Sequence, residues 1–309
     1  MVNKNTLELG PSSIADRTGW LKWRGRTLGA SEASSILGCN PWSTPLQLYA
    51  KKMGVMADKA SDSEAAKWGH RLQQPILDGW SDETGLPCRT WEIGVVNPQY
   101  PWLHATPDAV VGDEIPVVTD SMPDTVQAKA TSMERAWENG VPPMVFAQVQ
   151  QEMLVTNSKT SHVAVLFNGK RFSAFEVPFD EVWCESTLIP KTQAFYDGLE
   201  AGVPPKDITA DDADALKALW PSSVDVTEPI ALPGFLLDND DNLQQLKAQI
   251  KELEGQKRTL ENEFKAALEE HSEGVLPNGV RYSWKSATRE YKAKEAYSVN
   301  TRILRRHKS

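Results

Sequence analysis

The chain has 309 residues, enough for one large folded domain with an appendage. A charged fraction of 24% and a hydrophobic fraction of 40% are typical of a soluble globular protein, and no apolar run reaches the length that crosses a bilayer. The first residues lack the basic-then-apolar order of a secretion signal. The three cysteines lie far apart, which argues against a disulfide framework, a zinc ribbon and an iron–sulfur cluster. We therefore expect a cytoplasmic protein that does not bind a membrane.

The net charge of −9 is distributed unevenly along the chain. Residues 281–309 carry nine Lys and Arg against two Glu, a charge of +7, which leaves −16 on the preceding 280 residues. A basic tail on an acidic body is typical of an arm that binds nucleic-acid phosphates. A solvated charged terminus is an equally good interpretation, because such tails are common on proteins that bind no nucleic acid.

Capping residues and apolar spacing predict four helices in the first two thirds of the chain. They are expected at residues 44–52, 64–83, 143–156 and 181–200. Extended segments are expected at 91–96, 103–111 and 125–130, and then a hairpin of 162–167 and 171–177. This order is typical of the α/β (α+β) class, with a mixed central sheet flanked by helices. Residues 1–204 are therefore expected to form the core.

The last third of the chain is expected to lie outside this core. Residues 205–240 are rich in Pro and Asp and are predicted to form an irregular connector. Over 241–272, apolar residues recur at intervals of three and four, with Lys257 at one apolar position, which predicts a coiled-coil-like helix. Packing of this helix on the body and self-association are equally compatible with so few heptads. Residues 273–309 are expected to form a hairpin and the basic tail.

Two short motifs in the expected sheet indicate phosphodiester chemistry. Asp108 ends the sequence Thr-Pro-Asp, and Gln127, Ala128 and Lys129 lie together on the next expected strand. Alternation along a strand sends the side chains of residues 127 and 129 to the same face. A carboxylate can ligate Mg²⁺, which makes a bound water more acidic, while a lysine stabilises the negative charge that develops. The pattern is typical of metal-dependent phosphodiesterases, although such a short motif also occurs by chance.

Four further segments occur in the order found in one protein family. They are GWLKWRGRTLGASEASSILG (19–38), AAKWGHRLQQPILDGWSDETG (65–85), HATPDAVVGD (104–113) and AQVQQEMLVT (147–156). Together with the lysine strand they resemble the motifs of the YqaJ-type viral recombinase family and of the phage lambda exonuclease-like nucleases, in the PD-(D/E)xK superfamily. The resemblance covers residues 17–200 and implies a restriction-endonuclease-like core with a C-terminal helical and basic extension.

The resemblance implies roles for residues that match the family motifs. Arg24 and Ser31 would contact the 5′ phosphate of a DNA end, and a guanidinium suits this contact because it can grip two phosphate oxygens. Asp108 matches an aspartate that ligates metal, Lys129 matches the catalytic lysine, and Gln148 matches a glutamine near the active site. The simpler interpretations are a surface salt bridge for Arg24, a helix N-cap for Ser31 and a buried hydrogen-bonding role for Gln148.

The chain departs from the family pattern at two acidic positions. Gln73 and Gln127 stand where the family has glutamates, and a neutral amide binds Mg²⁺ more weakly than a carboxylate. The resemblance implies a site for Mg²⁺, or Mn²⁺ in its place, formed by Asp108, Gln127, the backbone carbonyl of Ala128 and Gln73. Three explanations compete: a tolerated variant that keeps activity, a degenerate member that binds DNA ends without cutting, and an engineered isosteric knockout.

Other acidic residues near these motifs have no match in the family. Asp113, Glu114 and Asp124 are alternative carboxylates, although no sequence pattern places them in the site. Gln151 and Glu152 belong to the segment 147–156 and also match no motif.

The function that the resemblance implies is a metal-dependent 5′-to-3′ exonuclease on linear double-stranded DNA, in phage-type recombination. Its partners would be a single-strand annealing protein and further copies of the chain, three in a ring, and its place the host bacterial cytoplasm if a phage or prophage encodes it. One alternative is a catalytically silent protein that binds DNA ends. Another is an endonuclease of the same superfamily, which would cut closed circles. A third is a protein whose helix at 241–272 makes it chiefly an assembly module.

Overall fold

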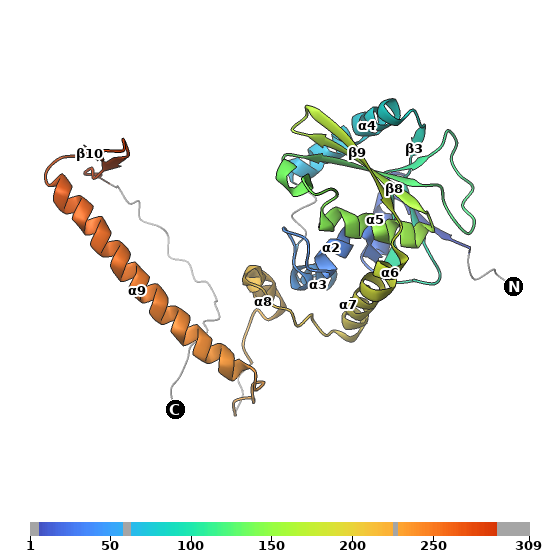
Figure 1. Ribbon diagram of the computed structural model, residues 1–309. Helices are drawn as coiled ribbons and strands as arrows, with labels where there is room; N and C mark the ends of the chain where they lie inside the picture. The colour runs from blue at the N-terminus through green and yellow to red at the C-terminus, as the bar shows by residue number, and fades with distance from the viewer. Residues whose placement is uncertain (1–5, 58–62, 225–227, 289–309) are drawn as a thin grey trace. The chain divides into compact units, whose positions relative to one another are not determined.

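The structure is a computed structural model, and it describes residues 6–57, 63–224 and 228–288. The chain divides into two compact units, Met1–Pro221 and Ser222–Ser309, and each is described by itself (Figure 1). Residues 228–288 belong to the second unit, and the candidate site residues all belong to the first.

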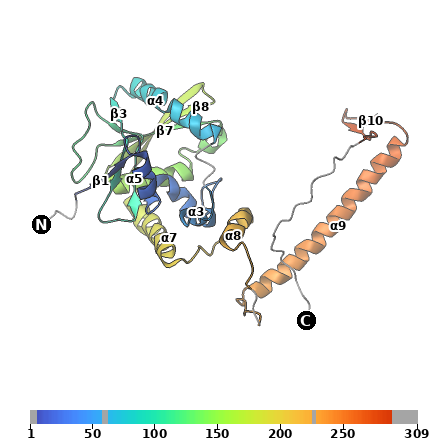
Figure 2. The ribbon, with the colours of Figure 1, turned by 180° about the vertical axis from the view of Figure 1, so that it is seen from behind.

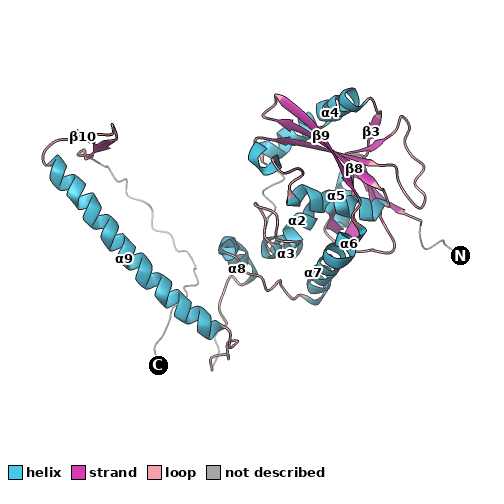
Figure 3. Cartoon of the chain, in the orientation of Figure 1, coloured by secondary structure: helices cyan, strands magenta, loops and turns pink. Residues whose placement is uncertain are grey.

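Helices and strands alternate through the first unit (Figure 3). Its strands are β1 (Glu8–Ser12), β2 (Leu28–Gly29), β3 (Cys88–Thr90), β4 (Ile93–Val96), β5 (Leu103–His104), β6 (Ala109–Val111), β7 (Thr125–Thr131), β8 (Thr160–Phe167) and β9 (Arg171–Pro178). Its α-helices are α1 (Arg17–Arg24), α2 (Ala33–Ile36), α3 (Pro45–Lys52), α4 (Glu64–Thr84), α5 (Pro143–Thr156), α6 (Glu181–Trp183), α7 (Ile189–Ala201) and α8 (Ala213–Leu219). Short 3₁₀ turns lie at η1 (Ala30–Glu32), η2 (Glu134–Trp137) and η4 (Ala210–Asp212), and a π-helical segment, η3 (Cys184–Leu188), joins α6 to α7.

A five-stranded sheet with the order β3-β6-β7-β8-β9 forms the centre of the unit. Strands β7 and β8 run parallel, and the other neighbouring pairs run antiparallel. The sheet is therefore mixed, as the sequence predicted. In the β6–β7 register Ala109 pairs with Val126, so Asp108, just before β6, lies beside Gln127.

Helices cover both faces of this sheet, with α4 and α5 on opposite sides (Figures 1 and 2). Ile76 and Trp80 of α4 pack with Val126 on one face. Val149 of α5 packs with Val163 on the other face. Because side chains alternate along β7, residues 127 and 129 are directed to the α5 side of the sheet.

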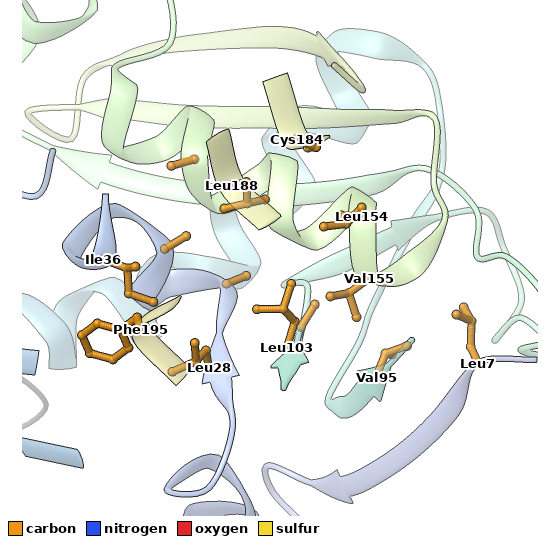
Figure 4. Packing of buried hydrophobic residues seen from close by; sticks show 14 of the residues in the cluster. Leu7, Leu28, Ile36, Val95, Leu103, Leu154, Val155, Cys184, Leu188 and Phe195 are labelled. Carbon is orange, nitrogen blue, oxygen red and sulfur yellow. The ribbon is translucent and has the colours of Figure 1, made fainter. Parts of the chain in front are cut away.

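Helix α5 is buried almost all round. Ten of its fourteen residues are buried, since a second core lies on the side of α5 away from the sheet. Leu154 and Val155 pack there with Leu28, Leu103 and Leu188 (Figure 4). A helix covered on both sides carries any polar side chain it contains into the protein interior. This burial decides the environment of the polar residues on α5.

Most elements form close to their predicted residues, and local signals explain why. Thr44 caps α3, with its hydroxyl accepting from the backbone N–H of Gln47, and Pro45 follows as the first helical residue. Gly85 ends α4 in the left-handed conformation, at φ 70°. The hairpin of β8 and β9 turns at Asn168 and Gly169, both with positive φ.

The structure corrects two predicted strands. The strand expected at 103–111 is divided into β5 and β6, because Pro107 has no N–H to donate to a ladder. Asp108 therefore lies between β5 and β6, and its side chain does not follow the alternation of side chains along a strand. The strand expected at 91–96 begins only at Ile93, as β4, and β3 before it was not predicted.

Part of the expected connector is helical and packs in the first unit. Ala215 of α8 is buried with Leu46 and Ala50 of α3. The Thr44 hydroxyl donates to Asp212 at 2.5 Å, and the same carboxylate accepts from the backbone of Thr209 at 2.6 Å. Residues up to Pro221 thus pack with the core, whereas the sequence placed its end at 204.

The second unit contains one long helix, α9 (Leu236–Leu268), and a hairpin of β10 (Glu273–Val275) and β11 (Arg281–Ser283). Phe264 of the helix stacks on Tyr282 of the hairpin, with ring centroids 4.0 Å apart. Five of the predicted heptad residues are exposed on α9: Leu243, Leu246, Ile250, Leu253 and Leu260.

Most of the expected basic tail is not described. Of the basic residues counted there, Arg289, Lys292, Lys294, Arg302, Arg305, Arg306 and Lys308 lie outside the described residues. Within the described ranges, no helix combines the length and the apolar character needed to cross a membrane.

Candidate active site

A cleft of about 560 Å³ in the first unit brings together residues from five separate parts of the sequence. Its walls include six polar residues, from α1, η1, α4, the segment before β6, and α5: Arg24, Ser31, Gln73, Asp108, Gln148 and Glu152. The first five were predicted as site residues. Glu152 was not assigned a role from the sequence.

Asp108 is held by the neighbouring strand. Its Oδ2 accepts a hydrogen bond from the Ala128 backbone N–H at 2.9 Å and another from Gln127 Nε2 at 2.5 Å. Burial raises the pKa of Asp108, while the positive charge of Lys129, these two hydrogen bonds and His70 oppose the rise. The contact that Ala128 makes is through its N–H, whereas the resemblance implied a role for its carbonyl.

A chain of hydrogen bonds runs from Lys129 to Glu152. Lys129 Nζ donates to Gln148 Oε1 at 2.9 Å, and Gln148 Nε2 donates to Glu152 Oε1 at 2.9 Å. An amide offers its oxygen to a cation and its nitrogen to an anion, so these two partners determine the orientation of Gln148. The spacing of four residues places Gln148 and Glu152 on one face of α5.

Glu152 is a carboxyl group in the protein interior. The residue is 1% exposed, and its Oε2 has no hydrogen-bond partner among the described residues. Burial raises the pKa of Glu152 to about 8, and the negative charge of Asp108 adds to the rise, while Gln148 and Lys129 oppose it. The signal in the sequence was the one charged residue of helix α5, because a buried charge is rare without a partner or a function.

Arg24 and Ser31 form a pair at another wall of the cleft. A terminal nitrogen of the Arg24 guanidinium donates to Ser31 Oγ at 2.8 Å, and the guanidinium lies 5.1 Å from the ring centroid of Trp20. Glu32 lies 3.8 Å from Arg24 Nε, so the salt bridge considered as a simpler interpretation is also present. The Arg24 side chain is 33% exposed, which leaves part of it accessible to a ligand.

The alternative interpretation of Ser31 as a helix N-cap is wrong. The turn η1 begins at Ala30, one residue before Ser31, and Glu32 Oε2 accepts from the backbone N–H of Gly29 at 2.9 Å. A glutamate that reaches back in this way takes the capping role. The Ser31 hydroxyl is thereby left to Arg24.

A buried histidine lies below this pair. His104 is paired with the Thr27 hydroxyl at 2.8 Å through Nδ1, and its ring centroid lies 4.4 Å from that of Trp23. Burial lowers the pKa of His104 well below its usual range, and the charges of Arg24 and Lys52 lower it further. The imidazole is therefore neutral at pH 7. Sequence reasoning did not select His104, and a single histidine on a strand gives no signal that would have.

Comparison with known proteins gives this arrangement a family. Residues 19–159 match the YqaJ-like viral recombinase domain, and this range contains every residue described above as lining the cleft wall. The first unit contains a YqaJ-like viral recombinase domain.

Similarity extends beyond the YqaJ-like domain. Over 293 residues the chain is 26% identical to the uncharacterized protein YqaJ of Bacillus subtilis (strain 168), covering 92% of this chain and 88% of that protein. Among solved structures, the alkaline exonuclease LHK-Exo from Laribacter hongkongensis is 16% identical with a TM-score of 0.48, covering 59% of this chain and 92% of that one. A phage related exonuclease from Haemophilus somnus 129PT is 13% identical with a TM-score of 0.38, covering 57% and 96%.

The two amides that the resemblance places at glutamate positions, Gln73 and Gln127, have different surroundings. Gln127 is buried and donates to Asp108, and its Oε1 has no partner in the described ranges. Gln73 is half-buried on α4 and lines the cleft. Gln74, next to it, is exposed and accepts from the Thr90 hydroxyl. Gln127 thus belongs to the hydrogen-bond network of Asp108, and Gln73 belongs to the wall of the cleft.

The alternative carboxylates near the motifs lie elsewhere. Asp113 and Glu114 are exposed, and Asp124 accepts from the backbone N–H of Thr160 at 3.1 Å. None of the three is among the residues that line the cleft. Besides Asp108 and Glu152, the cleft contains one further acidic residue, Glu92.

The oxygen donors of the cleft and of the hydrogen-bond network beside it suit a hard divalent cation in kind. Asp108 supplies a carboxylate, and Gln127 supplies an amide oxygen that is buried without a hydrogen-bond partner among the described residues. Mg²⁺ and Mn²⁺ prefer such oxygen ligands. An unpartnered buried oxygen is costly, and a cation would satisfy it. The described residues contain no group of three or more Asp, Glu, His or Cys placed to hold a metal, so no cluster of carboxylates compensates there for the neutral amides at 73 and 127.

Proposed function

We propose that the chain is a metal-dependent exonuclease that digests one strand of linear double-stranded DNA in the 5′-to-3′ direction, within phage-type recombination. The observation that carries the proposal is that one cleft joins the Asp108 and Lys129 network to the Arg24 and Ser31 pair. The first is a site for hydrolysis and the second is suited to a terminal phosphate. The polarity follows from the family resemblance.

The proposed reaction is hydrolysis of a phosphodiester. Water adds to the phosphorus between the first and second nucleotides, the bond from that phosphorus to the 3′ oxygen breaks, and the 3′ oxygen takes up a proton. The first nucleotide leaves with its own 5′ phosphate, and the attacked phosphate remains as the new 5′ end of the strand. A bound Mg²⁺ or Mn²⁺ would supply positive charge to the phosphate and lower the pKa of a water. Asp108 and Gln127 would hold the cation, with Gln73 and the Ala128 carbonyl as further ligands.

The protein's own side chains would stabilise charge on the reacting phosphate and hold the end of the DNA strand in position. Lys129 would stabilise the negative charge that develops on the phosphate oxygens. Gln148 orients Lys129 through its 2.9 Å hydrogen bond, and so would keep the ammonium directed to the reacting phosphate. Arg24 and Ser31 would bind the 5′ phosphate of the strand end, and would set the distance from the end to the bond that is cut.

Digestion of this kind leaves a 3′ single strand. We propose a single-strand annealing protein as the partner that receives it, and a ring of three chains around the DNA as the assembly. The ring explains how the enzyme would stay on one DNA molecule through many cuts. Light scattering should give the mass of three chains at working concentration, and a monomer would remove this part of the proposal.

The test uses a linear duplex with 5′ phosphates, in Mg²⁺ and separately in Mn²⁺. The unmodified chain should release mononucleotides from the linear duplex and leave a closed circle intact, and Lys129→Ala should abolish release. Cutting of the closed circle would instead establish the endonuclease alternative.

A second candidate function is binding of DNA ends without cleavage. The observation that favours it is the pair of neutral amides, Gln73 and Gln127, at positions that hold glutamate in the family. It predicts tight binding to 5′-phosphorylated ends with no product in either cation. Restoration of both glutamates would then create activity that the unmodified chain lacks.

A further inference from the structure

We propose that Glu152 is the second carboxylate ligand of the divalent cation site in this cleft, and supplies negative charge that Gln73 and Gln127 lack. The inference rests on the proposed function, because it concerns the cation of the same site. Glu152 has no counterpart among the family motifs on which the other assignments depend.

The first argument is the burial of Glu152. Its Oε1 accepts one hydrogen bond, from Gln148, and its Oε2 accepts none from the described residues although the residue is 1% exposed. A carboxylate taken out of water requires several hydrogen bonds or a positive partner to offset the loss of hydration. Among the described residues Glu152 accepts from one neutral donor, so an ionised Glu152 in this place would require a positive ligand.

The second argument is the position of Glu152. It lines the same cleft as Asp108, on the face of α5 that carries Gln148 toward Lys129 of β7. Gln127 Oε1, on the same strand, is the other buried side-chain oxygen of the network that has no partner in the described part of the chain. Two unsatisfied oxygens on facing elements therefore belong to the network around Asp108.

The third argument is charge. Asp108 alone would leave a divalent cation with an excess charge of about +1, whereas Asp108 and Glu152 together neutralise it. The alternative is a structural role, in which a protonated Glu152 only holds Gln148 in place. Glu152→Gln distinguishes the two roles. The amide can still accept a hydrogen bond from Gln148, so a structural role would be retained, whereas the cation would lose a charged ligand.

The experiment measures Mn²⁺ binding to the full chain without DNA, from the electron paramagnetic resonance signal of free Mn²⁺. Glu152→Gln should weaken binding about tenfold or more, comparable with Asp108→Asn. Asp82→Asn, which removes an exposed charge from α4 beyond the cleft, should bind as the unmodified chain does. Glu152→Gln that binds Mn²⁺ as tightly as the unmodified chain would overturn the inference, and so would an unmodified chain that binds none.

A second readout guards against misfolding. Mn²⁺ should raise the melting temperature of the unmodified chain and of Asp82→Asn, and should leave that of Glu152→Gln nearly unchanged. An equal rise in all three proteins would overturn the inference.

Digestion of linear duplex is measured in parallel and separates this inference from the proposed function. Loss of Mn²⁺ binding in Glu152→Gln, with no digestion by the unmodified chain, would support the cation site and reject the nuclease. Digestion by the unmodified chain, with unchanged binding and digestion in Glu152→Gln, would keep the nuclease and reject the role of Glu152.

Discussion

At the scale of single residues, the amide of Gln127 does something that a glutamate could not do. Its Nε2 donates to Asp108 and so stabilises the ionised carboxylate in a partly buried place. A glutamate there would put a second negative charge beside Asp108 and would give no donor. The amide thus allows Asp108 to remain charged without a cation, at the expense of affinity for the cation.

Gln127→Glu should therefore make folding depend on the cation. Without divalent cations we expect the free energy of unfolding to fall by about 2 kcal/mol, because a hydrogen bond is lost and two carboxylates face each other. Mn²⁺ should restore the loss and bind more tightly than to the unmodified chain. Urea unfolding in EDTA and in Mn²⁺ measures both effects.

Gln193→Glu is the matched control. Gln193 also donates to an aspartate, Asp197, at 2.8 Å, but both belong to α7 and the pair is exposed. We expect a small loss that Mn²⁺ does not restore. Equal behaviour of the two variants would show that position 127 does not contact the cation.

The raised pKa of Glu152 predicts a dependence of stability on pH. Between pH 6.5 and 8 the unfolded chain has an ionised Glu152, whereas the folded chain retains a proton on it because its pKa is about 8. The folded state binds more protons, so the free energy of unfolding falls as pH rises, by at most about 1.4 kcal/mol per pH unit.

Two histidines affect stability mainly outside this window. The pKa values of His104 and His162 are lowered by burial, so their effect is largest below their usual value of 6.5. Urea unfolding at pH 6.5 and 8 in EDTA should show the fall for the unmodified chain and a much smaller one for Glu152→Gln. The same slope in both proteins would mean that Glu152 titrates normally.

Arg24 should determine the preference for phosphorylated ends. Arg24→Ala removes the guanidinium from the cleft, so digestion of a 5′-phosphorylated duplex should slow by about tenfold or more relative to a 5′-hydroxyl duplex. Arg171→Ala is the control, since Arg171 is exposed and paired with Glu134. Initial rates on the two substrates measure the preference. If the unmodified chain uses both ends equally well, the assignment of Arg24 is wrong.

At the scale of elements, α5 links the core to the site. Its apolar residues pack against the sheet on one side and against the second core on the other, so the positions of Gln148 and Glu152 depend on this packing. The hydrogen bond from Gln148 to Lys129 then connects the helix to β7. Side chains on such a rigid element keep their positions better than side chains on a loop.

Val149→Ala tests this packing. Val149 is fully buried between α5 and the sheet, and loss of two methyl groups should lower the free energy of unfolding by about 2 kcal/mol. Val182→Ala, at an exposed position of α6, should leave stability unchanged within about 0.5 kcal/mol. Urea unfolding measures both, and equal stability of the two variants would mean that the face of α5 toward the sheet is not close-packed.

At the scale of the whole molecule, the family match and the compact units have different boundaries. The match to the YqaJ-like domain ends at residue 159, within the first unit. The second unit has a long helix with an exposed apolar row and a hairpin on which Lys285 pairs with Glu273. The relative from Bacillus subtilis matches 92% of the chain, so similarity to a known protein is not restricted to the family domain.

The sequence by itself determined the elements that depend on local chemistry. Helix α5 begins at the second of two prolines and ends at Thr156, where Asn157 caps it in the left-handed conformation at φ 53°, and both ends agree with the prediction. The motif order placed Asp108 and Lys129 on neighbouring strands; β6 and β7 are neighbours, and Asp108 lies just before β6 rather than on it. These signals act over a few residues, or repeat a pattern shared by a family.

Only the tertiary structure decided which polar residues share the cleft. Burial of Glu152 depends on two separate layers that cover α5, and no local pattern encodes layers contributed by distant segments. The same holds for α8, whose few apolar residues gain a partner only when α3 is beside them. Long-range packing determines the environment of a side chain, and the environment determines whether a glutamate is a surface charge or a candidate ligand.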